Sequence, residues 1–277
     1  MMDMIADSTP PHPASVAQDT APQSLSVEQW LQYADWSYQR GWTGPIPIGR
    51  EHKGRYKLPW VKGRHGIDGV DAPISQWERL ASDALKRCET TPGILGIGQR
   101  LPAGVLGIDV DAYDDKNGKQ TLADWEARFG PLPDTYTVTA RTDGVSGIRL
   151  YQVPVGFYPK EAPNGGVEFL DHHHRYMAVP PSWHHTGNRY ALYLPSGKRS
   201  KSGVLPPLDR IPLLPTSYLE GLPASATVAG GAGASDAEVE AFGQRYDSGP
   251  QPEAVLWIIG QTIRSRRQLA VREIDEL

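Results

Sequence analysis

The chain has 277 residues, of which 39% are hydrophobic, and its formal net charge is −4. This composition allows a packed core in one large domain, with or without a small appendage, and no stretch approaches the roughly 18 apolar residues of a membrane helix. Cys88 is the only cysteine, which excludes an internal disulfide and a multi-cysteine zinc knuckle. The first Lys or Arg is Arg40, so a secretory signal is not expected and the cytoplasm is the predicted compartment.

The N-terminal part combines a polar leader with a helix. Residues 1–24 carry four prolines among small polar residues, which predicts a disordered leader. Ser26 and Gln29 then have the spacing of a capping box, and apolar residues recur at helical intervals up to Gly41. We therefore expect a helix to begin just after Ser26 and to end before Gly41.

The following segments suggest one more helix and then mostly strands. After a short strand at 46–48, a helix is expected from Pro73, with an apolar face that runs from Ile74 to Cys88; on that face Cys88 fills core space. From Gly93 onward, short apolar runs bounded by glycine and proline are typical of strands. We expect strands at 93–98, 105–111, 135–140, 147–153, 167–170, 176–179 and 189–194, with a helix at 121–129.

This order of elements favours an α+β fold class, because helices come first and clustered strands later. The predicted domain covers residues 25–220. An Ala/Gly-rich linker at 221–235 and a small helical tail at 236–277 are expected to follow.

Two aspartates give the most informative local pattern. In the run from Val105 to Asp111, the side chains of Asp109 and Asp111 face the same side of a strand, about 7 Å apart. Glu168 lies between apolar neighbours on another expected strand. Mg²⁺ or Mn²⁺ relieves the repulsion between such carboxylates and prefers oxygen ligands. The alternative is that the two aspartates only cap the strand end before a loop.

The charge is unevenly distributed. Between Arg50 and His65, six basic residues stand against one acid, Glu51, which gives a local charge of +5. The basic residues are Arg50, Lys53, Arg55, Lys57, Lys62 and Arg64. Such a run is either a solvated loop or a surface that follows a nucleic-acid backbone. Tyr56 and Trp60 lie within it and could stack on bases or pack in the core.

An ordered set of short motifs resembles the bifunctional primase-polymerase family of the archaeo-eukaryotic primase superfamily. The resemblance covers roughly residues 41–195, and its second motif is most similar to replication proteins of actinobacterial phages and plasmids. The matching segments are Lys57-Leu58-Pro59, 93–98, Gly107-Ile108-Asp109-Val110-Asp111, Ser146-Gly147-Ile148-Arg149-Leu150-Tyr151, Val167-Glu168-Phe169 and Val179-Pro180-Pro181-Ser182-Trp183-His184.

The resemblance implies an RRM-like sheet joined to a second α/β unit, with the active site between them. It implies template-directed DNA primase/polymerase activity through two-metal nucleotidyl transfer, in which Asp109, Asp111 and Glu168 hold Mg²⁺ or Mn²⁺. The expected partners are single-stranded or primed DNA, ribo- or deoxyribonucleoside triphosphates, and a helicase domain or protein, all in the cytoplasm of a bacterial host cell. The predicted nucleotide ligands are Lys57, Arg149, Ser182 and His184. The predicted DNA contacts are Arg50, Lys53, Arg55, Lys62 and Arg64.

One position departs from the family pattern. Arg149 stands where the family usually has a histidine that contacts nucleotide phosphates. If Arg149 faces the acidic side of its strand, it can replace that histidine as a phosphate ligand, or it can form an ion pair with one of the acids. Arg141 is open to a phosphate role or a plain surface role, and the run His172–His174 predicts a turn rather than a zinc site, because strand neighbours face opposite ways.

Two other functions remain open at the level of sequence. The paired aspartates also suit a metal-dependent nucleotide-sugar transferase. The substitution at Arg149 also leaves room for a catalytically inert replication protein that only binds DNA.

Overall fold

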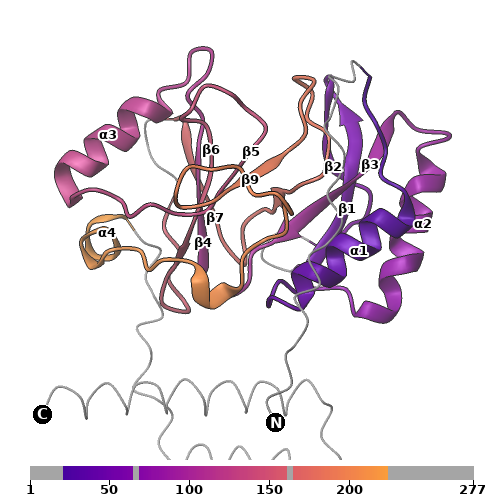
Figure 1. Cartoon of the computed structure of the whole chain (residues 1–277), viewed down its shortest axis with the longest axis horizontal. Coiled ribbons are helices and arrows are strands. Elements are labelled where there is room, and N and C mark those ends of the chain that lie inside the picture. Colours follow the sequence, from indigo (N-terminus) through magenta and orange to yellow (C-terminus); the bar gives the residue numbers. More distant parts are fainter. Residues whose placement is uncertain (1–20, 65–68, 161–164, 224–277) are drawn as a thin grey trace, which may run out of the picture. The chain divides into compact units, whose positions relative to one another are not determined.

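The computed structural model describes residues 21–64, 69–160 and 165–223 (Figure 1). The chain divides into two units, Met1–Thr227 and Val228–Leu277, and every described residue belongs to the first. The predicted helical tail at 236–277 and most of the predicted linker lie outside the described residues. Within the described part, no helix has the length and apolar character to cross a membrane.

The first sheet has four antiparallel strands in the order β2-β1-β3-β8. Helices α1 and α2 pack against the same face of this sheet (Figure 1). The strands are β1 (Gly44–His52), β2 (Arg55–Pro59), β3 (Gly93–Arg100) and β8 (Met177–Ala178), and the helices are α1 (Val27–Tyr38) and α2 (Trp77–Arg87), the latter preceded by the 3₁₀ turn η1 (Ile74–Gln76).

Both helices begin close to where the sequence predicts. The Ser26 hydroxyl accepts the Gln29 N–H at 3.1 Å and the Gln29 side chain accepts the Ser26 N–H at 2.9 Å, so the capping box is confirmed. The second prediction is wrong at one end, because Ile74 lies in η1 with 52% of its surface exposed and the buried face begins at Trp77. Cys88 packs against the core cluster, as expected.

The end of the predicted leader is ordered. The Ser24 hydroxyl accepts the Leu95 N–H at 2.7 Å, and the Leu25 N–H donates to the Leu95 carbonyl at 2.8 Å. These bonds fix residues 24 and 25 beside β3, so the prediction of disorder up to residue 24 extends too far.

The second sheet has five antiparallel strands in the order β7-β4-β6-β5-β9. Helices α3 and α4 pack on one of its faces (Figure 1). The strands are β4 (Val105–Val110), β5 (Thr137–Thr139), β6 (Gly147–Gln152), β7 (Val167–Leu170) and β9 (Ala191–Tyr193), the helices are α3 (Gly118–Phe129) and α4 (Thr216–Gly221), and η2 (Leu208–Arg210) is a 3₁₀ turn.

A single core cluster joins the two sheets. Leu95 and Ile97 of β3 belong to the same cluster as Ile148 and Leu150 of β6. On its opposite face the second sheet packs against α3, where Trp125 stacks on Phe169 with ring centroids 5.6 Å apart. Two sheets with helices on their outer faces confirm the α+β prediction.

The basic run forms part of a hairpin, not a free loop. β1 and β2 pair across a turn in which Lys53 and Gly54 both have positive φ, 52° and 74°. On β3, Gly98 leaves room for the Tyr176 ring, since a Cβ there would stand 2.9 Å from the ring. The Tyr176 hydroxyl donates to the Lys57 carbonyl at 2.6 Å, which ties the chain before β8 to β2.

Candidate active site

Three carboxylates gather on the inner face of the second sheet. Asp109 of β4 stands directly opposite Glu168 of β7, and directly opposed residues of an antiparallel pair project to the same face with Cβ atoms roughly 4.5–5.5 Å apart. The Asp111 N–H donates to the Gly166 carbonyl at 2.7 Å, so the ladder with the β7 side of the chain continues past Asp109. Ile108 and Phe169, one residue away, face α3 instead.

The electrostatics show that these acids act on one another. Burial, and then the charges of Asp111 and Glu168, raise the pKa of Asp109 to about 7, although Lys57 and Lys116 oppose the shift. The pKa of Asp109 is thus affected by two other acids and by two cations. Such a perturbed acid, grouped with other charged residues, is typical of a functional site.

Two cations that the sequence analysis did not single out neutralise two of the acids. Lys116, on the loop between β4 and α3, forms an ion pair with Asp111. Arg175, in the turn between β7 and β8, forms an ion pair with Glu168. Within the described ranges, Asp109 has no ion pair. The only signal in the sequence is that each basic residue stands in a turn a few positions after an acid.

The donor set suits a hard divalent cation, because three carboxylates face one side and Asp109 has no ion pair with any residue that the structure describes. In the present side-chain positions, however, no three acidic, histidine or cysteine side chains of the described residues converge on a common metal position. Asp111 and Glu168 are engaged by Lys116 and Arg175 instead.

Basic residues from other elements complete the site. Lys57 of β2 is exposed, and its charge acts on Asp109. Burial, and then the charges of His185, Arg141, Lys57 and Arg55, lower the pKa of His184 to about 3. The structure thus brings Lys57 and His184, both predicted nucleotide ligands, and Arg55, a predicted DNA contact, into one electrostatic neighbourhood.

The hydrogen bonds of His184 indicate its tautomer. The Thr186 N–H points at His184 Nδ1 at 3.3 Å, and the Thr186 hydroxyl lies 2.8 Å from the same atom. Nδ1 therefore accepts a hydrogen bond, which leaves the ring proton on Nε2. With its pKa lowered to about 3, His184 is neutral at physiological pH and carries one N–H donor.

Arg141 is the site residue that the sequence left undecided. Its guanidinium carbon lies 3.1 Å from the centroid of the Tyr113 ring, in a cation–π contact. Its charge also contributes to the lowered pKa of His184. This position, beside the predicted phosphate ligands, favours the phosphate role over the plain surface role.

Ser182 lies elsewhere than predicted. Its hydroxyl accepts the Ile97 N–H at 2.8 Å and donates to the Ile97 carbonyl at 2.9 Å, and only 2% of the residue is exposed. The single hydroxyl proton is used, so Ser182 has no donor left for a phosphate. Its part is to fasten the segment after Pro181 to β3.

Arg149 also departs from the prediction. In the β4–β6 ladder Arg149 pairs with Ile108, whereas Asp109 pairs with Ile148, so Arg149 projects to the face opposite the acids. Its guanidinium donates to the Val145 carbonyl at 2.8 Å and to the Gly147 carbonyl at 3.4 Å. Neither the phosphate role nor the ion pair with an acid fits this position.

The remaining predicted DNA contacts are spread over the basic run. Arg50, Lys53 and Lys62 are exposed. Arg64 instead donates to the Val70 carbonyl and to the Gln76 side chain, each at 3.1 Å, and so holds its own segment in place. Trp60 is buried, with its indole N–H on the Ile94 carbonyl, so it packs in the core and cannot stack on bases.

The histidine run forms the predicted turn. His172 Nδ1 lies 3.0 Å from the Leu101 carbonyl, and His174 Nδ1 lies 2.9 Å from the Phe169 carbonyl. The His172 and His173 rings contact each other edge to face, with centroids 5.1 Å apart.

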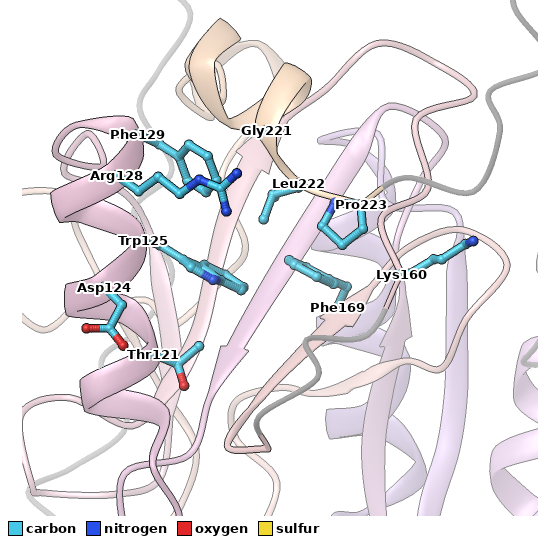
Figure 2. A pocket seen from close by; sticks show the side chains of 10 residues that line it. All are labelled: Thr121, Asp124, Trp125, Arg128, Phe129, Lys160, Phe169, Gly221, Leu222 and Pro223. Carbon is cyan, nitrogen blue, oxygen red and sulfur yellow. The ribbon is translucent and has the colours of Figure 1, made fainter.

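Two hollows lie apart from the acids. One, of about 330 Å³, lies between α3 and β7 and is lined by Trp125, Phe169 and the cations Arg128 and Lys160 (Figure 2). The other, of about 450 Å³, contains Arg149. Neither is lined by Asp109, Asp111 or Glu168, although Arg141 lines the larger one together with Arg149.

Taken together, two antiparallel sheets with a shared core and an acidic strand pair beside lysine, arginine and a neutral histidine define an α+β protein suited to phosphate chemistry. The chain belongs to the bifunctional DNA primase/polymerase family: the profile of that family's N-terminal domain matches residues 34–213. No curated protein and no solved structure matches the chain. The family match confirms the resemblance carried by the sequence motifs and places the protein among DNA primase/polymerases.

Proposed function

We propose that the protein is a template-directed DNA primase/polymerase that transfers a nucleotidyl group from a nucleoside triphosphate to a 3′-hydroxyl, in phage or plasmid replication in the cytoplasm of a bacterial host. The observation that carries this proposal is the register of β4 and β7. It places Asp109 opposite Glu168, with Asp111 beside them and the charge of Lys57 acting on Asp109. The family match supports it.

The acids are the proposed metal ligands. Asp109, Asp111 and Glu168 would hold Mg²⁺ or Mn²⁺, whose chemistry is to neutralise phosphate oxygens and to lower the pKa of the attacking hydroxyl. Asp109 would offer both of its oxygens, because it has no ion pair among the described residues, whereas Lys116 and Arg175 each engage one oxygen of Asp111 and Glu168.

The basic residues are the proposed triphosphate ligands. Lys57 offers a compact positive charge and Arg141 a planar guanidinium that can contact two phosphate oxygens. His184 offers the Nε2–H as a neutral donor. Together they stabilise the negative charge that grows on pyrophosphate as it leaves. Ser182 and Arg149 take no part, for the reasons given by their positions.

The exposed cations of the hairpin are the proposed template contacts. Arg55 lies nearest the site, since its charge acts on His184, and Arg50, Lys53 and Lys62 extend the basic surface along the same segment. Phosphate contacts of this kind position the DNA without reading its sequence.

The test is nucleotide incorporation on primed and unprimed single-stranded DNA, with Mg²⁺ or Mn²⁺ and with ribo- or deoxyribonucleotides. We expect incorporation by the wild type and a loss of about 10²–10³-fold or more in Asp109→Ala/Asp111→Ala. The matched control is Asp114→Gly/Asp115→Ala, which removes two exposed acids from the adjacent loop and should keep activity; glycine is used at position 114 because its φ is 53°.

A folded wild type that binds DNA and Mn²⁺ but incorporates no nucleotide under any of these conditions would contradict the proposal. It would leave a protein that only binds DNA. The position of Arg149 is the observation that favours this alternative, because the substituted side chain does not face the acids and so does not replace the phosphate contact of the family histidine. The family match favours the primase/polymerase over a nucleotide-sugar transferase.

A further inference from the structure

We propose that Lys116 and Arg175 are exchangeable counter-ions of the acidic site. They hold Asp111 and Glu168 while no metal is bound, and they turn to the triphosphate when metal and nucleotide enter together. The inference rests on the proposed function, and it adds two nucleotide ligands and a coupling between the two substrates of the site.

Two of the three carboxylates have a cationic partner. Lys116 contacts Asp111 and Arg175 contacts Glu168, one cation for each of the two outer acids, while Asp109 between them has none in the described ranges. Each cation engages one oxygen of its carboxylate, Asp111 Oδ2 or Glu168 Oε2. A divalent metal held by these acids competes with the two cations for the same carboxylates, so metal binding and the ion pairs weaken one another.

Both cations can leave their acids without disturbing the fold. Their side chains are 41% and 49% exposed, so their departure opens no hole in the core. Neither residue belongs to a strand: Lys116 follows a turn closed by its own N–H on the Tyr113 carbonyl at 3.1 Å, and Arg175 lies between β7 and β8. No bond of the β4–β7 ladder depends on either side chain.

The released cations can bind the triphosphate. They remain attached to turns that flank the acids, and the ligand that enters is polyanionic. An ammonium and a guanidinium are suitable ligands for phosphate oxygens. Nucleotide thus compensates the two cations that metal displaces, so each ligand should tighten the binding of the other, and by linkage the factor is the same in both directions.

The experiment measures Mn²⁺ affinity by electron paramagnetic resonance, with and without a non-hydrolysable deoxynucleoside triphosphate. The variants are Lys116→Ala and Arg175→Gly. Glycine is chosen at position 175 because the residue has φ +66°, which glycine adopts without strain. Lys119→Ala is the matched control, since it removes an exposed lysine three residues away that has no carboxylate contact among the described residues.

We expect Mn²⁺ alone to bind about 5–20-fold more tightly to each variant than to the wild type, and nucleotide to bind more weakly in the presence of Mn²⁺. The coupling factor between the two ligands should shrink accordingly. Lys119→Ala should match the wild type in all three quantities. Far-ultraviolet circular dichroism and melting curves establish that the variants are folded, and Lys116→Gln provides a second, uncharged variant at that position.

Unchanged or weaker Mn²⁺ binding in the Lys116 and Arg175 variants would overturn the inference. The double variant Asp109→Ala/Asp111→Ala separates this failure from a failure of the proposed function. If it abolishes Mn²⁺ binding while the cation variants change nothing, only the counter-ion inference is wrong. If the wild type and the double variant bind Mn²⁺ equally, the acids are not the metal site and both proposals are wrong.

Discussion

The pKa of Asp109 is shifted strongly by burial and by neighbouring charges. Its pKa is raised to about 7, by burial first and by Asp111 and Glu168 next, against an ordinary value of 3.8. In the metal-free protein, the folded state therefore binds a proton on Asp109 at a pH where the unfolded chain has already lost it.

This shift predicts a pH-dependent stability. Because the folded pKa lies above the unfolded one, the free energy of unfolding should fall as pH rises from about 4 to about 7, and the full penalty should remain above pH 7. Asp109→Asn removes the penalty, so in a chelating buffer it should stabilise the protein by a few kcal/mol at pH 8 and by much less at pH 5.

Urea denaturation at the two pH values checks the expectation. Asp115→Asn, an exposed acid in the following loop, is the control and should change little at either pH. An equal effect of Asp109→Asn at pH 5 and pH 8 would mean that the ionisation of Asp109 does not oppose folding.

At this scale the sequence predicts the acids well and their ligands less well. Alternation along one strand is enough to put Asp109 and Asp111 on one side. Alternation alone does not predict the face of Arg149, because that face depends on the register between β4 and β6. In this register Arg149 pairs with Ile108. The ion pairs of Lys116 and Arg175 depend on where two turns fold back, which no local pattern specifies.

At the scale of elements, the hydroxyl of Ser182 joins two parts of the fold. It satisfies both the N–H and the carbonyl of Ile97 on β3, in a place where only 2% of the residue is exposed. Ser182 was predicted to bind phosphate, but its hydroxyl binds the backbone of β3, 85 residues earlier in the chain.

Ser182→Ala should therefore reduce stability and leave the affinity for nucleotide unchanged. The loss of the hydroxyl leaves the buried Ile97 N–H without a partner, whereas the Ile97 carbonyl keeps the Val179 N–H at 3.1 Å. An unpaired buried group costs about 1–3 kcal/mol in unfolding free energy. Denaturation and nucleotide titration measure the two effects separately. Weaker nucleotide binding at unchanged stability would restore Ser182 as a ligand.

The hairpin of β1 and β2 shows where the patterns failed for an element. Basic residues are frequent at positions 50–65, and the apolar alternation there is limited to Tyr56 and Leu58, which is too short to identify a half-buried strand. The pairing with β1 and the positive φ values of Lys53 and Gly54 make it a hairpin instead. The strand at 167–170, with its apolar flanks, was predicted with the bounds that the structure has.

At the scale of the whole molecule, the net charge of −4 hides a local basic surface. If that surface binds the DNA backbone, affinity should fall with salt in proportion to the number of phosphates contacted. Arg55→Ala should lower the slope of log affinity against log salt by about 0.7 on single-stranded DNA.

Arg64→Ala is the matched comparison within the same run. Its guanidinium is held by Val70 and Gln76, so its removal should leave the salt slope unchanged. Fluorescence anisotropy with labelled single-stranded DNA at several salt concentrations gives both slopes. If both substitutions lower the salt slope equally, DNA binds the run through its total charge and not through particular residues.

The fold class could be read from the order of helices and strands, whereas the sheet order could not. The strand order β7-β4-β6-β5-β9 places the third acid, nearly sixty residues after the second, next to the first two. Cross-strand neighbours so far apart in sequence are fixed by the assembled core and not by any short-range pattern.

The core cluster that joins the two sheets has a further consequence for motion. Leu95 and Ile97 pack with Ile148 and Leu150 in one continuous apolar interior, so the sheets cannot swing apart on a hinge without exposing it. Entry and release of substrates then depend on turns and long side chains, which move in nanoseconds to microseconds. A turnover limited by slow opening and closing of the two halves is not expected of this enzyme.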